Sequence, residues 1–351
     1  MRLKELAADR SAAGLPDLSL IVLAEDDAAV AAGEQVRRVV ARQYLVRLLR
    51  AVRTLREDRP DAPEVARALE LLDAWDVDEA LDRALRPDMT GWIWRGTRPG
   101  TDPEALLTLL GRCLDPERPG ATAHVGLGAR RPAAPVVTTA AGSRAAQLFG
   151  WACEGDEDPL DLAPERAREF AATVQRGADA LAAVWPEGRE MAAIDIQAFA
   201  ALGGHRGLRP LNFSIHGLRG LVLTSERPAY MLAQTLVHEA THQRFSGILD
   251  CVAVVRNPEA RHHSPFVDAE RPLGHIVHGI LSFINDVHVA GRHLEVERDP
   301  AERARIQRYL ALKTDQLRVA EKNLLEVAEP TEHGARLLAG CRSAIDRLDR
   351  G

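Results

Sequence analysis

Residues 228–245 read PAYMLAQTLVHEATHQRF, a helix-forming run opened by a proline. Within this run, residues 238–242 form an HExxH motif. Histidines at positions i and i+4 share one face of a helix, about 5–6 Å apart at Cβ, so both imidazoles can reach one metal ion. The helical wheel adds Met231, Thr235 and Phe245 to the histidine face and leaves the opposite face apolar. We therefore expect a helix that is buried on both sides, with its histidines turned to a cavity.

Helical periodicity extends outward from this segment in both directions. Further helices are expected at 34–56, 63–85 (a pair), 102–113, 163–185, 272–289, 299–328 and 334–349. Two short stretches, 192–202 and 217–225, favour strands, although the alanines of the first stretch would also suit a helix. The pattern predicts an α+β protein that is predominantly helical, with a small sheet beside the HExxH helix. We expect a helical N-terminal region at 1–185 and a metal-site region with the C-terminal helices at 186–351.

The composition is that of a globular protein, with 46% hydrophobic and 27% charged residues. The 45 basic and 51 acidic side chains give a net charge of −6, which argues against nucleic-acid or anionic-membrane binding as the main function. No secretory signal is visible, and no apolar run approaches the roughly 18 residues of a membrane span. The four cysteines form no CxxC pair. Scattered thiols of this kind favour a cytoplasmic protein.

Two histidines alone hold a metal weakly, so a third ligand is expected elsewhere in the chain. The metzincin pattern HExxHxxGxxH fails, because Phe245 and Ile248 occupy the positions of its glycine and third histidine. Spacing alone hardly distinguishes between four downstream candidates for this ligand: Glu270, His275, His278 and Asp286.

His278 and several neighbouring histidines also have simpler interpretations. His278 shares a polar track with Ser282 and Asn285, opposite the apolar stripe of its helix, and such a track lines a site or faces water. His288 falls at the edge of the stripe, where a histidine packed in the core is the usual finding. The two histidines at 262–263 lie in a polar stretch that predicts an exposed loop.

Two metal chemistries fit an HExxH helix. In a zinc metallopeptidase, Glu239 takes a proton from the metal-bound water. A three-ligand site with open positions also suits non-haem iron(II) and oxygen. If 2-oxoglutarate is the cosubstrate, a cation must hold its distal carboxylate, and arginine does this well. Arg271 is a candidate for that role, and Arg219 and Arg244 are others. A third possibility is a noncatalytic, metal-stabilised peptide-binding protein.

A longer stretch carries a resemblance. Residues 217–250 read GLRGLVLTSERPAYMLAQTLVHEATHQRFSGILD, and residues 264–289 read SPFVDAERPLGHIVHGILSFINDVHV. The region of about 215–295 resembles the HExxH-motif peptide-modification family, whose members occur with ribosomally made, post-translationally modified peptides. The resemblance is carried by the HExxH helix, Arg271-Pro272-Leu273, His278-Gly279 and Phe283.

This resemblance implies an iron(II)- and 2-oxoglutarate-dependent hydroxylase that acts at the β-carbon of residues in a precursor peptide. It also implies that His238, His242 and His278 bind iron and that Arg271 anchors 2-oxoglutarate. In that chemistry Glu239 abstracts no proton and instead orients ligands or water. The chain departs from the family at 240–241, where Ala-Thr replaces a bulky residue and glutamine, and in the SPFVDAE loop, which lacks a tryptophan. These departures leave the choice of substrate open.

Overall fold

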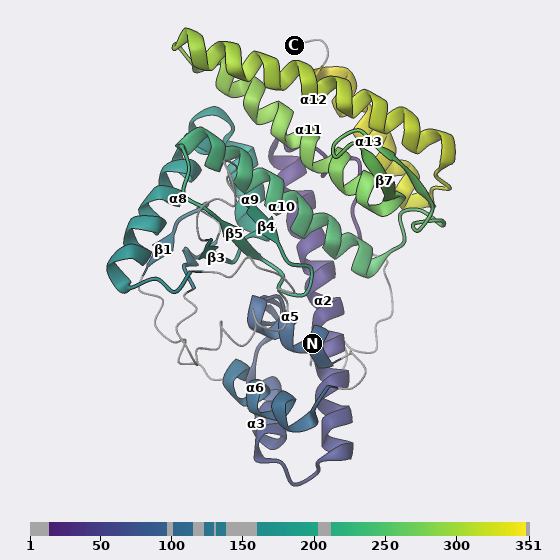
Figure 1. Cartoon of the computed structure of the whole chain (residues 1–351). Helices are drawn as coiled ribbons and strands as arrows, with labels where there is room; N and C mark the ends of the chain where they lie inside the picture. Colours follow the sequence, from purple (N-terminus) through teal and green to yellow (C-terminus); the bar gives the residue numbers. More distant parts are fainter. Residues whose placement is uncertain are drawn as a thin grey trace.

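The computed structural model describes residues 14–96, 101–114, 123–129, 131–137, 160–202 and 212–348. Helices make up most of these residues, and the strands form small sheets among them (Figure 1). This confirms the predicted fold class, α+β and predominantly helical.

The HExxH segment forms α10 (Ala229–Cys251), which lies at the centre of the fold. It packs against α11 (Leu273–Val296), α8 (Pro164–Val184), α2 (Asp27–Asp58) and α9 (Pro186–Asp195). A helix enclosed by four others must be apolar nearly all round, apart from the positions that serve a site. The buried residues of α10 accordingly lie on several sides of it, as the sequence predicted.

The N-terminal helices extend the fold away from α10. The helix α2 begins after Asp26, whose side chain accepts a hydrogen bond from the backbone N–H of Ala29 at 2.8 Å. The predicted pair at 63–85 is present as α3 (Pro63–Ala74) and α4 (Val77–Ala84), followed by α6 (Pro103–Leu114). Helix α5 (Pro87–Gly96), which lies between them, was not predicted.

A three-stranded sheet lies beside α10, as expected. Its order is β3 (Ala198–Ala201), β5 (Leu221–Thr224) and β4 (Asn212–Ser214). Strand β3 runs parallel to β5, and β4 runs antiparallel to it. The predicted strand at 192–202 is wrong over its first part, because residues up to 195 belong to α9, which begins at Pro186 and buries one apolar side. A smaller pair, β1 (His124–Val125) and β2 (Ala134–Pro135), is antiparallel.

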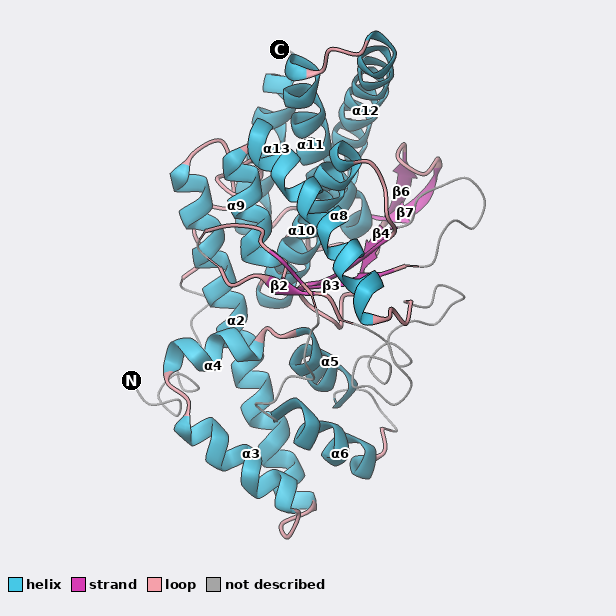
Figure 2. Ribbon diagram, turned by 90° about the vertical axis from the view of Figure 1, so that its left-hand side faces the viewer, coloured by secondary structure: helices cyan, strands magenta, loops and turns pink. Residues whose placement is uncertain are grey.

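The C-terminal part consists of a hairpin and three helices, of which α11 and α12 (Pro300–Val327) contact the hairpin. Strands β6 (Arg261–Ser264) and β7 (Ala269–Pro272) pair antiparallel and turn at Asp268, whose φ of 51° is a left-handed conformation that aspartate tolerates. The expected loop at 262–263 is therefore a strand, held by backbone pairing that polar sequence does not reveal. The closing helices are α12 and α13 (Glu332–Leu348), close to the predicted bounds. Figure 2 shows the hairpin next to α12.

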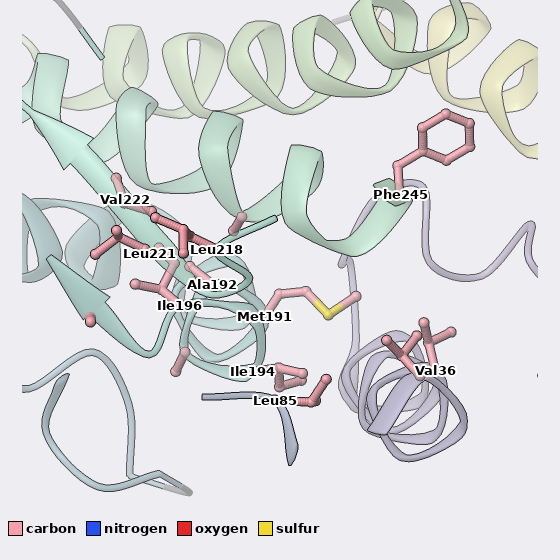
Figure 3. Close-up of a cluster of buried hydrophobic side chains, with 14 of the residues drawn as sticks. Val36, Leu85, Met191, Ala192, Ile194, Ile196, Leu218, Leu221, Val222 and Phe245 are labelled. Carbon is pink, nitrogen blue, oxygen red and sulfur yellow. The ribbon is translucent and has the colours of Figure 1, made fainter. Parts of the chain in front are cut away.

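One hydrophobic cluster extends across both predicted regions of the chain. Figure 3 shows the part where Val36 of α2 lies near Met191 and Ile194 of α9. The indole of Trp185, between α8 and α9, donates a hydrogen bond to the carbonyl of Ala24 at 2.6 Å. The region boundary at 185/186 stays a prediction. No helix in the described parts of the chain is long and apolar enough to cross a membrane.

Candidate metal centre

Three histidines from two helices meet beside α10. His238 and His242 approach each other through their Nε2 atoms, which are 3.0 Å apart. The Nδ1 atom of His242 lies 3.1 Å from Nδ1 of His278, which α11 contributes from its second turn. The sequence offered four candidates for the third ligand without ranking them. Of these four, His278 is the one that contacts the HExxH pair directly through a ring nitrogen.

Asp286, also a candidate ligand, instead contacts the back of His238. Its Oδ2 lies 2.9 Å from Nδ1 of His238, and it also accepts a hydrogen bond from the hydroxyl of Tyr309 at 3.2 Å. In the neutral form of His238, Nδ1–H donates to the carboxylate, and Nε2, which faces His242, has a lone pair. This carboxylate–histidine arrangement commonly orients a metal ligand and raises its basicity.

Burial and neighbouring charge set the protonation of the three rings. Burial lowers the pKa of His238, but the charge and hydrogen bond of Asp286 together with the charge of Glu239 outweigh burial and raise the pKa to about 9. The pKa of His242 is lowered to about 2 by burial and then by its two histidine neighbours. Burial also lowers the pKa of His278 to about 3, with a smaller effect of His275. His242 and His278 are therefore neutral near pH 7, the form of imidazole that binds metals.

The donor set suits a divalent metal, although the rings do not yet converge. His242 offers Nε2 to one neighbour and Nδ1 to the other, so no single point lies before all three donors. Accordingly, within the described residues no group of three or more His, Cys, Asp or Glu is arranged to hold a metal ion as it stands. Two imidazole nitrogens about 3 Å apart nevertheless need a shared proton or a cation between them. A bound metal satisfies that need.

Glu239 lies on the neighbouring side of α10 and is only 2% exposed. One of its oxygens accepts a hydrogen bond of 2.5 Å from Nδ2 of Asn212 on β4. Arg227 in turn donates to Oδ1 of Asn212 at 2.9 Å and to the hydroxyl of Thr235 at 3.0 Å. The second carboxylate oxygen of Glu239 is buried without a hydrogen-bond partner in the described residues. Such an oxygen is costly to leave unpaired, so it suits a water molecule or a substrate donor.

Aromatic rings form one wall of the site. The Phe283 ring meets His238 edge-on, with centroids 5.4 Å apart, and stacks on Phe266 from the hairpin at 4.6 Å. The Nζ of Lys313, on α12, lies 4.0 Å from the centroid of Phe283. Phe245 meets His278 edge-on at 4.4 Å. Three successive elements, the hairpin, α11 and α12, thus contribute to this wall.

Several other predicted residues lie outside the histidine cluster. Glu270 and Arg271 are exposed on β7, where Arg271 pairs with His262 in the strand register. His275 is exposed on α11, one turn before His278. His288 is partly buried and meets the Trp185 ring edge-on at 4.5 Å, the core position that the sequence predicted.

The two other candidate arginines are buried and already bonded to protein groups. Arg219 bonds to the carbonyl of Gln243 and lies 3.4 Å from Asp250. Arg244 pairs with Asp195 at 2.6 Å. Both side chains are less than a tenth exposed, and their bonds support the packing of α10 against its neighbours.

A cavity opens beyond Tyr309, between α10, α11 and α12. Its volume is about 180 Å³. Its lining is mostly apolar, with Met231, Val289 and Ile306 among the side chains, and Arg305 lies over the Tyr230 ring at 4.5 Å near them. Tyr309 lines this cavity and also bonds to Asp286, so one side chain connects the cavity with the metal centre.

The sequence alone indicated the HExxH pair and included the third histidine among its candidates. It did not indicate Asn212, Tyr309 and Lys313, which reach the site from β4 and α12 and belong to no local motif. Chemically, the arrangement offers three imidazoles, an orienting carboxylate and a buried glutamate with one oxygen to spare. Compared with protein-family models and with curated proteins, the sequence matches none.

Proposed function

We propose that the protein is an iron(II)- and 2-oxoglutarate-dependent dioxygenase that hydroxylates a side-chain β-carbon in a ribosomally made precursor peptide. The observation that carries this proposal is the contact between His278 and the HExxH pair, with Nδ1 atoms 3.1 Å apart. The resemblance of residues 215–295 to the HExxH-motif peptide-modification family implies the same three ligands. A cytoplasmic location, with no role for nucleic acid or membrane, belongs to this proposal.

Each residue of the site has its own role in this proposal. His238, His242 and His278 would hold iron, and Asp286 keeps the Nδ1 proton of His238 on the side away from it. When bound, iron supplies the chemistry by which O₂ and 2-oxoglutarate give succinate, CO₂ and a hydroxyl group on the peptide carbon. Phe283 and Phe266 shield the site from water on one side. Glu239, held by Asn212, has a second oxygen to position a water molecule or a peptide N–H.

A zinc metallopeptidase is the second candidate, and the same Glu239 favours it. The unpartnered oxygen of that carboxylate lies on the helix that carries both histidines, where a general base for a metal-bound water belongs. In this function Glu239 is indispensable.

The test measures succinate from iron-reconstituted protein supplied with 2-oxoglutarate and O₂, because oxygenases of this class turn over slowly without their peptide. We expect succinate that depends on iron and is lost in His238→Ala. Absence of succinate together with tightly bound zinc and peptide cleavage would replace the proposal with the peptidase. Absence of succinate and of any bound metal would contradict both enzymes, and peptide binding without turnover would then indicate a binding protein.

A further inference from the structure

A lysine lies against the aromatic wall, close to the metal centre but outside its donor set. Lys313 is half-buried on α12, and its Nζ lies 4.0 Å from the centroid of Phe283. That ring also contacts His238, at 5.4 Å between centroids. The Nζ atom of Lys313 therefore lies at most about 9.4 Å from the centroid of the His238 ring.

The ammonium has few partners of its own. It donates a hydrogen bond of 2.8 Å to Oε1 of Gln316, which is a neutral group. Among the described residues no ion pair within 4.0 Å engages Lys313, whereas Asp286 is the carboxylate whose charge it feels at longer range. Burial lowers the pKa of Lys313 and Asp286 counters the effect, so the side chain is a partly desolvated cation.

We propose that Lys313 binds the distal carboxylate of 2-oxoglutarate, in the place that the resemblance implies for Arg271; the inference rests on the proposed function. The cosubstrate has a keto-acid group at one end, a carboxylate at the other and two methylene groups between them. The keto-acid end belongs at the histidines, the methylene groups fit the Phe283 ring, and the second carboxylate meets the ammonium. A cation in a partly buried site attracts a carboxylate more strongly than an exposed one does.

The competing cations are less suited to this role. Arg271 is exposed on β7. Arg227 already donates to Asn212, Thr235 and Ser225, which fixes it beside Glu239. Arg219 and Arg244 are bonded within the protein interior. Of these five cations, Lys313 is the one whose charged atom lies over the ring that contacts His238.

A purely structural role for Lys313 makes a different prediction. If the ammonium only offsets the charge of Asp286, its removal would change stability or metal content and would affect all 2-oxo acids equally. If it binds the distal carboxylate, its removal would weaken only ligands that possess this group.

The experiment is calorimetric titration of iron-reconstituted protein with 2-oxoglutarate without O₂, and with 2-oxobutyrate, which lacks the distal carboxylate. For Lys313→Gln we expect 2-oxoglutarate binding to weaken about tenfold or more and 2-oxobutyrate binding to stay the same. Lys313→Arg should restore part of the difference. Lys322→Gln, at a second lysine on the same helix, is the matched control and should leave both ligands unchanged.

The outcomes separate this inference from the proposed function. Iron content and melting temperature are measured for every variant, so a folding defect is recognised. Unchanged 2-oxoglutarate binding in Lys313→Gln, an equal loss for both ligands, or a larger loss in Arg271→Gln would overturn the assignment of Lys313 while the hydroxylase proposal stands. If the unmodified protein binds no 2-oxoglutarate, both fail together.

Discussion

Glu239 is the residue whose role differs most between the two candidate enzymes. One oxygen is bonded to Asn212 and the other is buried without a described partner. We expect Glu239→Gln to retain succinate formation within about tenfold, because the amide oxygen still accepts from Asn212 and the hydroxylase needs no general base here. The measurement is the rate of succinate release.

A peptidase would respond to the same change differently. Loss of a general base that activates the attacking water costs about 10²–10⁴-fold, with the metal still bound. If Glu239→Gln abolished all turnover at unchanged metal content, the role that the hydroxylase gives this residue would be contradicted. His238→Ala, which removes a proposed ligand, serves as the control for metal loss.

The sequence indicated Asp286 as a candidate metal ligand, but it did not indicate that Asp286 contacts the back of His238. It contacts Nδ1 of His238 and also accepts from Tyr309. We expect Asp286→Asn to weaken iron or zinc affinity about 10–100-fold, because the ring loses its negatively charged acceptor. Chelator competition measures the affinity. Tyr309→Phe, which keeps the carboxylate of Asp286, should show a smaller loss of metal affinity. Equal losses of affinity in the two variants would contradict the larger role given to Asp286.

The HExxH pair could be predicted because i, i+4 spacing on one helix is local information. The choice of His278 over His275 could not, since it depends on how α11 turns against α10. Asn212 had no signal at all, because β4 is a short strand of ordinary polar sequence and its contact with Glu239 is formed only in three dimensions.

At the scale of elements, the crossing of α8 and α10 is unusually close. A Cβ added at Gly177 on α8 would lie 2.4 Å from Cβ of Leu232 on α10, a position fixed by the backbone. We expect Gly177→Ala to destabilise the protein by about 1–3 kcal/mol, because the helices must separate. Urea denaturation measures the change.

The matched control is another helical glycine. At Gly291 on α11, an added Cβ would meet nothing within 4 Å, so a methyl group fits there in open space. Gly291→Ala should therefore stabilise the protein by roughly 0.5–1 kcal/mol through helix propensity. If both substitutions stabilised it, the close approach of α8 and α10 would be disproved.

A partly buried histidine, His288, connects α11 to the turn between α8 and α9. The pKa of His288 is lowered to about 4 by burial and then by Arg292 and Arg347. Because its folded pKa is below the unfolded value of 6.5, its stabilising effect is complete above pH 6.5 and is lost as the pH falls toward 4. Between pH 7 and 5 this loss amounts to about 2 kcal/mol.

The experiment compares His288→Gln with the unmodified protein. Melting temperatures are measured in the apo form at pH 7 and at pH 5. We expect the fall on acidification to be smaller in the variant, since glutamine binds no proton. An identical fall would show that His288 is protonated equally in the folded and unfolded chain.

Elements with clear periodicity could be predicted with bounds close to those observed, as α8, α12 and α13 show, whereas α10 and α11 begin where predicted but continue past the predicted ends. The errors have physical causes. The stretch at 192–195 alternates like a strand, yet helix α9 continues through it because its apolar side is buried. The β6–β7 hairpin carries charged and polar residues, and its stability comes from backbone pairing and contacts with α12, such as Asn323 with the carbonyl of His263 at 3.1 Å.

At the scale of the molecule, Arg244 joins three segments that are distant in sequence. It bonds to the carbonyls of Ile21 and Met191 and pairs with Asp195 at 2.6 Å. We expect Arg244→Met to destabilise the protein by about 3–5 kcal/mol, because it leaves Asp195 buried and charged. Urea unfolding at neutral pH gives the value.

The double variant tests the cause. Adding Asp195→Leu to Arg244→Met removes the uncompensated charge and should recover part of the lost stability. If Asp195→Leu lowered the stability further, the hydrogen bonds of Arg244 to the two carbonyls would contribute more to stability than its ion pair with Asp195. None of these contacts was predictable, since each links residues that only the folded core brings together.

The enclosure of α10 by α2 has a consequence for biosynthesis. The ribosome completes α2 at Asp58, but α10, one of the helices that cover the apolar face of α2, begins only at Ala229. At about 5–20 residues per second, that face waits roughly ten to thirty seconds for its partner during translation. The side of α2 that packs on α10 thus lacks this partner throughout that time, although α3, α4 and α5 are already present to cover other parts of the helix.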